Sequence, residues 1–358
     1  GGDTGSDCVG TSNRQGAVSV TQMEIMPKPP EHENKAITWP NWPLIMRTSS
    51  SHDEGCQRQW AVATKSFEGK NNSVTAINAV RLEWGEEGMK EVKGSEHQIK
   101  ADRVLLARQQ FETDGFFLAA QPLFPDHVLA SAVAGMDAVK TGDFDTGVPP
   151  SNDALYDPTR LCKINDAHLA STGIYRLLTN EALGEWAAAV TGARMVQIWA
   201  SQLLIKPPGS EAAGHVGWHQ DRQYWKYWRQ PLGLFTAWIA LSDVTAESGP
   251  MRFVRRSHQW GFLDQGDFFG SDHEALKADI QMPTGDIWEE ADALLPAGGV
   301  SFHDCLTYHS SGANTSETPR CSVAVHMRTQ ETEPVSGDTS YYISHLDDSA
   351  HCPVIYSG

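Results

Sequence analysis

Two apolar runs typical of buried strands, Val196–Ile205 and Phe235–Leu241, flank the polar motif His219-Gln220-Asp221. Because side chains alternate along a strand, residues two positions apart point to the same face. A strand through this motif would direct His219 and Asp221 to one side, where they could supply two ligands to a metal ion. The sequence therefore predicts a β structure with a metal site inside it.

A third ligand is expected from a distant strand. His309 would complete a set of two imidazoles and one carboxylate, which holds non-haem Fe(II) on one face and leaves the opposite positions open. His303 is a competing third ligand, since it lies close by in the sequence. This argument alone leaves both histidines as candidates for the third ligand.

The short motif is weak evidence by itself, because a pattern such as His-x-Asp or His-x-Glu occurs about once by chance in a chain of this size. A second copy exists at His52-Asp53-Glu54. It lies among Ser49, Ser50, Ser51 and Gly55, which are typical loop residues, whereas His219 lies between apolar runs. Context therefore favours His219.

An arginine gives a second, independent indication. Arg320 opens the apolar run Cys321–Met327, and strand periodicity would place it on the same face as Ser322 and Ala324, the side with room for a ligand. An arginine inside a closed barrel needs an anionic partner, and its planar guanidinium binds a carboxylate through two hydrogen bonds. A dicarboxylate cosubstrate bound to iron would be such a partner.

Further motifs follow one another in a fixed order between about residues 109 and 330. They are Phe111-Glu112-Thr113-Asp114-Gly115-Phe116, Lys206-Pro207-Pro208-Gly209, Trp218-His219-Gln220-Asp221, Ala237-Trp238-Ile239-Ala240-Leu241, Gly249-Pro250-Met251 with Ser257-His258, and His309-Ser310-Ser311-Gly312. This part of the chain resembles the phytanoyl-CoA dioxygenase family of Fe(II)- and 2-oxoglutarate-dependent oxygenases. The resemblance implies a mainly β fold with flanking helices, a double-stranded β-helix or jelly-roll that encloses a ligand cavity.

The resemblance also implies roles for single residues. His219, Asp221 and His309 would bind iron, and the serine two positions and the arginine eleven positions after His309 favour it over His303. Arg320 would bind the distal carboxylate of 2-oxoglutarate. Three further residues are candidates for the same cosubstrate pocket: Ser311, Trp238 and Gln202.

The expected reaction is a hydroxylation. In halogenating relatives a small residue leaves the carboxylate position open, but here Asp221 fills it. The resemblance implies Fe(II), 2-oxoglutarate and O2 as the reactive set, an aliphatic carbon of a small organic molecule as the target, and succinate and CO2 as products. The two alternatives are a catalytically silent jelly-roll used for binding and an NADPH-linked oxidoreductase component carried by the first part of the chain.

Other polar residues near these motifs are expected to be structural. His215, His258 and His326 are interpreted as structural or surface groups. Arg255 and Arg256 could contact an anionic substrate, yet two adjacent arginines more often form a solvated turn.

Four aromatic residues, Tyr224, Trp225, Tyr227 and Trp228, follow the His-x-Asp motif closely. They would place rings beside the iron if their segment folds back over the barrel mouth, where they could hold an apolar group or a cation. They could equally wall the core. The sequence leaves both possibilities open.

The first part of the chain has a different pattern. Its motifs are Gly1-Gly2-Asp3-Thr4-Gly5-Ser6-Asp7-Cys8, Met26-Pro27-Lys28-Pro29-Pro30, Trp39-Pro40-Asn41-Trp42-Pro43 and Arg47-Thr48-Ser49-Ser50-Ser51-His52. Residues 1–107 resemble the NADPH-binding domain of the glutamate synthase small subunit, and Gly2 and Gly5 would end its dinucleotide fingerprint. No flavin-binding half follows. The segment is therefore interpreted as a partial, Rossmann-like α/β domain, whether vestigial, fused or artefactual, joined to a complete oxygenase domain at residues 108–358.

Periodicity gives a coarse set of elements. Helices are expected at 4–15, 125–139 and 180–190, a short helix is expected to stop near Gly115, and strands are expected at 18–25, 73–84, 89–93 and 102–106. Residues 27–43, 141–158 and 261–292 are expected to be linkers. The last two are long for loops inside a compact domain, so they are candidates for substrate-specifying elements.

Composition sets outer limits. The chain has 358 residues, enough for two domains, and its formal charge of −17 disfavours nucleic acid and anionic membranes as partners. Its six cysteines show no paired metal-ligand spacing, which favours reduced thiols and a cytoplasmic location. No apolar stretch reaches transmembrane length and no signal peptide is visible. The expected partner is a small-molecule substrate, and the oligomeric state stays open.

Overall fold

The computed structural model describes residues 9–10, 12–13, 17–24, 27–30, 48, 50–70, 73–85, 88–100, 107–152, 156–209 and 214–357. Within it the chain forms two compact units, Gly1–Leu106 and Ala107–Gly358. The boundary lies one residue before the one expected from the sequence.

The first unit contains two small sheets. Strands β1 (Thr21–Glu24) and β2 (Gln57–Trp60) pair in parallel, and the helix α3 (Ser50–Asp53) precedes β2. Four further strands pair antiparallel: β3 (Val62–Lys70), β4 (Ser73–Gly85), β5 (Gly88–Glu91) and β6 (His97–Lys100). The strands expected near 73–84 and 89–93 are thus confirmed. The strand expected at 102–106, Gly2 and Gly5 lie outside the described residues, as does most of the helix expected at 4–15.

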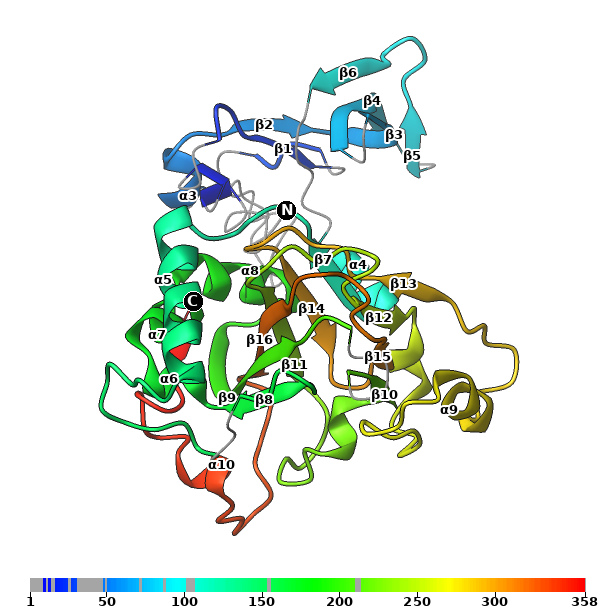
Figure 1. The fold of residues 1–358 in the computed structure, drawn as a ribbon. Coiled ribbons are helices and arrows are strands. Elements are labelled where there is room, and N and C mark those ends of the chain that lie inside the picture. The colour runs from blue at the N-terminus through cyan, green and yellow to red at the C-terminus, as the bar shows by residue number, and fades with distance from the viewer. Residues whose placement is uncertain are drawn as a thin grey trace. The chain divides into compact units, whose positions relative to one another are not determined.

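The second unit is built on two sheets that face each other (Figure 1). The larger has the order β17-β9-β16-β11-β14-β7, with β8 paired to β9, and the smaller has the order β10-β15-β12-β13. The large sheet comprises β7 (Phe116–Ala119), β8 (Cys162–Asn165), β9 (Met195–Lys206), β11 (Leu234–Ala240), β14 (Val300–Asp304), β16 (Arg320–Thr329) and β17 (Val354–Ser357). The small sheet comprises β10 (Val216–His219), β12 (Met251–Val254), β13 (Glu290–Asp292) and β15 (His309–Ser311). This is the expected jelly-roll.

Helices cover the outer face of the large sheet (Figure 1). They are α4 (Ala107–Asp114), α5 (Asp126–Lys140), α6 (Ala167–Ala170), α7 (Thr172–Leu178) and α8 (Glu181–Thr191). The side chain of Asn180 accepts a hydrogen bond from the first turn of α8, and Gly192 ends that helix in the left-handed conformation. The helices expected at 125–139 and 180–190 are therefore confirmed within two residues. The short helices η1 (Asp221–Gln223), η2 (Ser257–Trp260), α9 (His273–Asp279) and α10 (Tyr341–Ser344) lie in connections.

Alternation along the central strand β11 separates the core from the site. Phe235, Ala237 and Ile239 pack against the helices in the main apolar cluster. Trp238 packs on the other side, in a second cluster that contains Phe253 of the small sheet. The inner faces of the two sheets therefore enclose the space where ligands can bind.

Several expectations need correction. β10 ends at His219, so Asp221 does not lie on the same strand; it opens η1 instead. The strands β7 and β8 and the helices α6 and α7 were not predicted from the sequence. The segment 261–292, expected to be a linker, contains α9 and β13.

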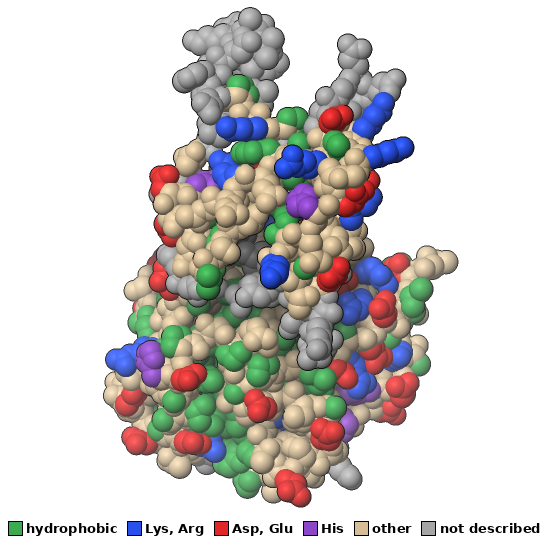
Figure 2. Space-filling view, turned by 90° about the horizontal axis from the view of Figure 1, so that it is seen from above, with side chains coloured by type: hydrophobic (Ala, Val, Ile, Leu, Met, Phe, Trp, Pro, Cys, Tyr) green, Lys and Arg blue, Asp and Glu red, His purple; other side chains and the backbone are tan. Residues whose placement is uncertain are grey.

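The surface charge is mixed, as far as it can be seen in one view. Figure 2 shows carboxylates and basic groups interspersed with hydrophobic side chains over the visible face. In the described part of the chain, no helix is long and apolar enough to cross a membrane. The five cysteines in that part are free thiols, and Cys8 lies outside it.

Candidate metal and cosubstrate site

His219 and His309 face each other across two paired strands. β10 and β15 run antiparallel, and their register places His219 directly opposite His309, with ring centroids 4.2 Å apart. Directly opposed side chains lie on the same face of a sheet. The two imidazoles therefore project together into the space between the sheets.

Asp221 reaches the same point by a different route from the one expected. Gln220 keeps an extended backbone, and its N–H donates to the side chain of Gln223, so the chain turns into η1 directly after the strand. The carboxylate oxygen Oδ1 of Asp221 lies 3.7 Å from Nε2 of His219 and 3.7 Å from Nε2 of His309. The two side chains come together as the spacing predicted, although the local structure is a strand end followed by a tight turn.

Both histidines are oriented by backbone carbonyls. Nδ1 of His219 donates to the carbonyl of Gly217 at 2.8 Å, and Nδ1 of His309 donates to the carbonyl of Thr307 at 3.0 Å. These bonds fix the tautomer and leave the lone pair of each Nε2 for a metal ion. Burial, followed by the neighbouring His219, holds the pKa of His309 well below its usual value, so this imidazole is in its neutral, ligating form.

The group fits a metal ion by its donor set. His219, Asp221 and His309 are buried, and one ligand atom from each lies within 4.8 Å of the others. Burial alone would raise the pKa of Asp221, but the nearby imidazole of His309, and then the close side chains of His219 and His303, hold it well below the usual range. Two imidazoles and one carboxylate are the set expected for non-haem Fe(II).

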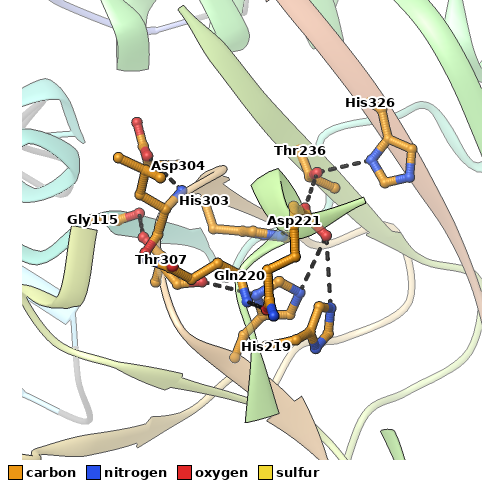
Figure 3. Close-up of polar contacts among 12 residues, drawn as sticks. Gly115, His219, Gln220, Asp221, Thr236, His303, Asp304, Thr307 and His326 are labelled. Carbon is orange, nitrogen blue, oxygen red and sulfur yellow. Dashed lines mark hydrogen bonds and ion pairs between the residues drawn. The ribbon is translucent and has the colours of Figure 1, made fainter. Parts of the chain in front are cut away.

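The second oxygen of Asp221 is held by a polar row on the large sheet (Figure 3). The hydroxyl of Thr236 donates to Oδ2 of Asp221 at 2.8 Å and lies 2.9 Å from Nδ1 of His326. Since the single hydroxyl proton of Thr236 goes to the carboxylate, Nδ1–H of His326 must be the donor in the second bond. Burial lowers the pKa of His326 to about 4, so this ring is neutral.

His303 completes the row but does not join the ligand group. It lies opposite Thr236 on β14, and its Nε2 is 3.4 Å from Oδ2 of Asp221. Neither ring nitrogen has a hydrogen-bond partner of good geometry among the described residues. The three-residue geometry therefore favours His309, and His303 lines the same cavity beside the carboxylate.

Arg320 lies buried at the other end of the cavity. One guanidinium nitrogen donates to the carbonyl of Gly249, the ring of Trp238 lies 5.1 Å from the guanidinium carbon, and Nε has no hydrogen-bond partner among the described residues. No carboxylate within the described ranges forms an ion pair with it, and burial lowers its pKa to about 10, which still leaves it charged at neutral pH. A buried cation without an anion is costly, so this end of the cavity is built to receive one.

One cavity joins all seven residues predicted from the sequence. It holds about 510 Å³ of empty space, with open solvent at its mouth included. Its walls include His219, Asp221, His309, Arg320, Ser311, Trp238 and Gln202. The structure thus brings together the whole predicted set.

Four lining or supporting residues were missed or misjudged. His326 was expected to be structural, yet it lines the cavity and supports Asp221 through Thr236. Thr236 and Lys206 carried a usable signal, since each is a polar residue at an inward position of an otherwise apolar strand. Lys163 belongs to no motif that could have identified it. Its ammonium lies 4.8 Å from the ring centroid of Phe268, which lines the cavity.

The aromatic residues after the motif divide into two groups. The ring of Tyr224 lies 5.9 Å from that of His219, and its hydroxyl accepts a hydrogen bond from the backbone of Phe268. Trp225 and Trp228 are buried against Trp199 in a separate cluster, and Tyr227 packs against it. One ring therefore contacts His219, while three wall the core.

The remaining candidates have ordinary partners. Arg255 pairs with Asp114 and Glu289, and Arg256 pairs with Glu289, so neither guanidinium is left for an anionic substrate. His258 lies within hydrogen-bond distance of the carbonyl of Glu112. His52 of the second His-x-Asp copy contacts Gln22 in the first unit, far in sequence from the cavity.

Solved structures share the fold of the second unit. The non-haem α-ketoglutarate-dependent carbocyclase SnoK of nogalamycin biosynthesis aligns with a TM-score of 0.54 and 20% identity, over 68% of this chain and 91% of its own. The epimerase SnoN of the same biosynthesis aligns with a TM-score of 0.50 and 21% identity, over 66% of this chain and 86% of its own. At these identities the likeness shows the fold alone.

The first part of the chain matches a different class of protein. The chain is 39% identical over 150 residues to the glutamate synthase [NADPH] small chain of Mycobacterium tuberculosis, which is 42% of this chain and 29% of that protein, so the match is longer than the first unit. It is also 41% identical over 119 residues to the glutamate synthase [NADH] of Saccharomyces cerevisiae. The chain thus spans less than a third of the length of these relatives.

Relatives of the second unit are more distant in sequence but cover it more fully. The ectoine dioxygenase of Bordetella parapertussis is 25% identical over 248 residues, which is 65% of this chain and 76% of that enzyme. The family model described as phytanoyl-CoA dioxygenase matches residues 111–322, well over half of the chain. The chain belongs to the phytanoyl-CoA dioxygenase family of 2-oxoglutarate-dependent non-haem iron oxygenases.

Proposed function

We propose that the second unit hydroxylates an aliphatic carbon of a small organic substrate, with His219, Asp221 and His309 as the iron ligands. One observation carries the proposal. Three convergent ligand atoms lie within 4.8 Å of one another, and the cavity that they face also contains the buried, anion-free guanidinium of Arg320. A metal and a dicarboxylate that binds it would satisfy both ends of this cavity.

The roles of the residues follow from these positions. Iron, when bound, supplies the redox chemistry that splits O2, with one oxygen atom entering the substrate C–H bond and the other converting 2-oxoglutarate to succinate and CO2. Arg320 binds the distal carboxylate, and Ser311, Trp238 and Gln202 surround the cosubstrate. Thr236 holds Asp221, and the buried walls exclude water from the reaction.

Part of the lining fits an organic substrate. Leu161, Val216, Met251 and Phe268 border the cavity, and the ring of Tyr224 contacts that of His219. Apolar walls with a few fixed polar groups are typical of small-molecule sites. Ectoine dioxygenase is one relative of this unit, but its substrate remains a candidate among others at 25% identity.

The test measures succinate formation from 2-oxoglutarate under air, with and without Fe(II). The wild-type chain is expected to form succinate only when iron is present, and to do so slowly even when no substrate is added. Asp221→Ala is expected to lose this activity because one iron ligand is removed. Arg320→Met should instead require much more 2-oxoglutarate. Asp137→Ala, which removes an exposed carboxylate on α5, is the matched control and should behave as wild type. Iron-dependent turnover that persists in Asp221→Ala would contradict the proposed ligand set.

The first unit supports a second proposal of narrower scope. Its likeness to the glutamate synthase small chain favours a partial nucleotide-binding segment at residues 1–107. NADPH-linked activity is therefore the alternative function, and a catalytically silent jelly-roll is the other. A fluorescence titration with NADPH separates them, since binding would support the former, and absence of both NADPH binding and succinate formation would support the latter.

A further inference from the structure

Lys206 is a buried lysine beside the cavity. It ends β9, and its side chain is fully buried. Its ammonium donates to the hydroxyl oxygen of Ser311 at 2.7 Å and to the carbonyl of Gly312. A lysine in such a position needs a reason, because burial of an ammonium without an anion is strongly unfavourable.

The nearest charged neighbour of Lys206 increases this cost. Lys206 and Arg320 are directly opposite in the register of β9 and β16, so two buried cations lie side by side. Burial, and then repulsion from Arg320, hold the pKa of Lys206 well below its usual value. Among the described residues neither cation has a carboxylate partner. The protein thus concentrates positive charge at one end of the cavity and supplies no anion to balance it.

Ser311 connects Lys206 to the cavity. The lysine ammonium has no acceptor site, so in the bond between the two residues the serine oxygen must be the acceptor. The hydroxyl proton of Ser311 is therefore available for another partner. Ser311 also lines the cavity together with Arg320, so its proton can be directed at a ligand there.

We propose that Lys206 is a positioning residue for the cosubstrate, orienting the hydroxyl of Ser311 toward the distal carboxylate that Arg320 binds. The inference rests on the proposed function, because it assumes 2-oxoglutarate as the ligand. Lys206 polarises the serine hydroxyl by donating to its oxygen, and it adds a second positive charge close to the carboxylate. Two buried cations and one oriented hydroxyl then share a single anion, which accounts for the missing protein carboxylate.

A purely structural role makes a different prediction. Lys206 also donates to the carbonyl of Gly312, so it could serve only to tie the end of β9 to the segment after β15. Such a tie would affect folding and every ligand alike. A positioning role affects only ligands that carry the distal carboxylate, and it acts through Ser311.

The experiment measures the dissociation constant of 2-oxoglutarate by calorimetry, with Mn(II) in place of iron, for the full chain. Lys206→Met, Ser311→Ala and the double variant are compared with wild type. In each single variant the dissociation constant of 2-oxoglutarate is expected to rise about tenfold, which corresponds to the loss of one hydrogen bond to a charged group. In the double variant the dissociation constant should rise by much less than a hundredfold, because the two residues act as one unit. Mn(II) affinity should stay unchanged throughout.

Two controls separate a specific effect from damage to the fold. Lys140→Met removes a partly exposed lysine from α5 and should bind 2-oxoglutarate as wild type. The second control is 2-oxopentanoate, in which a methyl group replaces the distal carboxylate, and its dissociation constant should be the same in wild type and Lys206→Met.

The inference is overturned if Lys206→Met binds 2-oxoglutarate as tightly as wild type does. It is also overturned if the fold-change of the double variant equals the product of the two single fold-changes, or if Lys206→Met binds 2-oxopentanoate more weakly by the same factor as 2-oxoglutarate. Should Lys206→Met fail to fold, Ser311→Ala alone decides, since an unchanged dissociation constant in that variant removes the proposed link. Failure of the proposed function is distinguishable, because wild type itself would then not bind 2-oxoglutarate.

Discussion

Each ligand side chain of the proposed metal site has its own hydrogen-bond partner. Gly217 and Thr307 orient the two imidazoles through backbone carbonyls, and the hydroxyl of Thr236 orients the carboxylate of Asp221. Such partners fix the direction of the ligand lone pairs before the metal arrives. The affinity for metal should therefore depend on residues that do not touch it.

Thr236→Val tests this dependence with almost no change in shape. The variant loses the hydrogen bond to Oδ2 of Asp221 and leaves Nδ1–H of His326 without an acceptor. We expect about 10- to 100-fold weaker binding of Mn(II), the usual range when such a partner is removed. Calorimetric titration of the folded variant measures it. Unchanged metal affinity would show that Thr236 does not support the site.

The residues of the proposed metal site could be selected from the sequence because metal-binding chemistry is restricted to a few residue types at defined spacings. Arg320 could be selected from the sequence as well, since it is a charged residue at the start of an apolar strand. Lys206 was not singled out, because a lysine that follows an apolar run usually lies at the surface, although its inward strand position was a usable signal and its side chain is fully buried opposite Arg320. His326 was missed because its role depends on the strand that lies beside it.

At the scale of elements, the segment before α9 is bonded to the strand that carries His219. The N–H of Gly217 donates to the carbonyl of Phe268, and the N–H of Asp267 donates to the carbonyl of Trp218. This pairing places the ring of Phe268 5.0 Å from that of His219. The expectation that residues 261–292 help to specify the substrate remains a prediction, and this contact supports it.

Gly217→Ala tests how closely these backbones must approach. A Cβ at this position would lie 2.2 Å from the carbonyl oxygen of Asp267, which is backbone and cannot rotate away. We expect a loss of about 1–3 kcal/mol in the free energy of unfolding, as for other overpacked sites, together with weaker Mn(II) binding. Gly312→Ala, where nothing lies within 4 Å of the added Cβ, is the control for stability. Equal stability of both variants in urea would contradict the close approach.

Sequence patterns located long elements better than short ones. The helices α5 and α8 were expected because each has an apolar period over ten or more residues. β7, β8, α6 and α7 have only four to seven residues, too few for a period to be distinguished from chance. The prediction of a single strand through His219 and Asp221 was also wrong, because the strand ends at His219 and a turn follows. This turn still directs Asp221 to the same side as His219, so the spacing of the two residues could not distinguish it from a strand.

For the whole molecule, buried histidines predict a dependence of stability on pH. The pKa of His326 is about 4 in the folded state and 6.5 when unperturbed, so the unfolded chain takes up this proton first as the pH falls. Its contribution, about 3 kcal/mol, is present above pH 6.5 and is lost between pH 6.5 and 4. His326→Asn keeps a donor to Thr236 without titrating. In urea at pH 7 and pH 4.5, the metal-free variant should lose less stability than wild type, and an equal loss would contradict the assignment.

The two units should be separable, because among the described residues the second unit forms four apolar clusters of its own. A chain of residues 107–358 is expected to fold and to bind Mn(II) and 2-oxoglutarate with the dissociation constants of the full chain. Circular dichroism and calorimetry measure both properties. A folded fragment that binds neither ligand would show that the first unit contributes to the site.

The most direct test of the whole account is an anaerobic titration of the full chain with Fe(II) and 2-oxoglutarate, followed by visible absorption. Binding of both to the group His219, Asp221 and His309 predicts a weak charge-transfer band that saturates at one equivalent of iron and is absent in Asp221→Ala. A folded wild-type protein that gives no band would contradict the proposed site, as would a band of the same strength in Asp221→Ala.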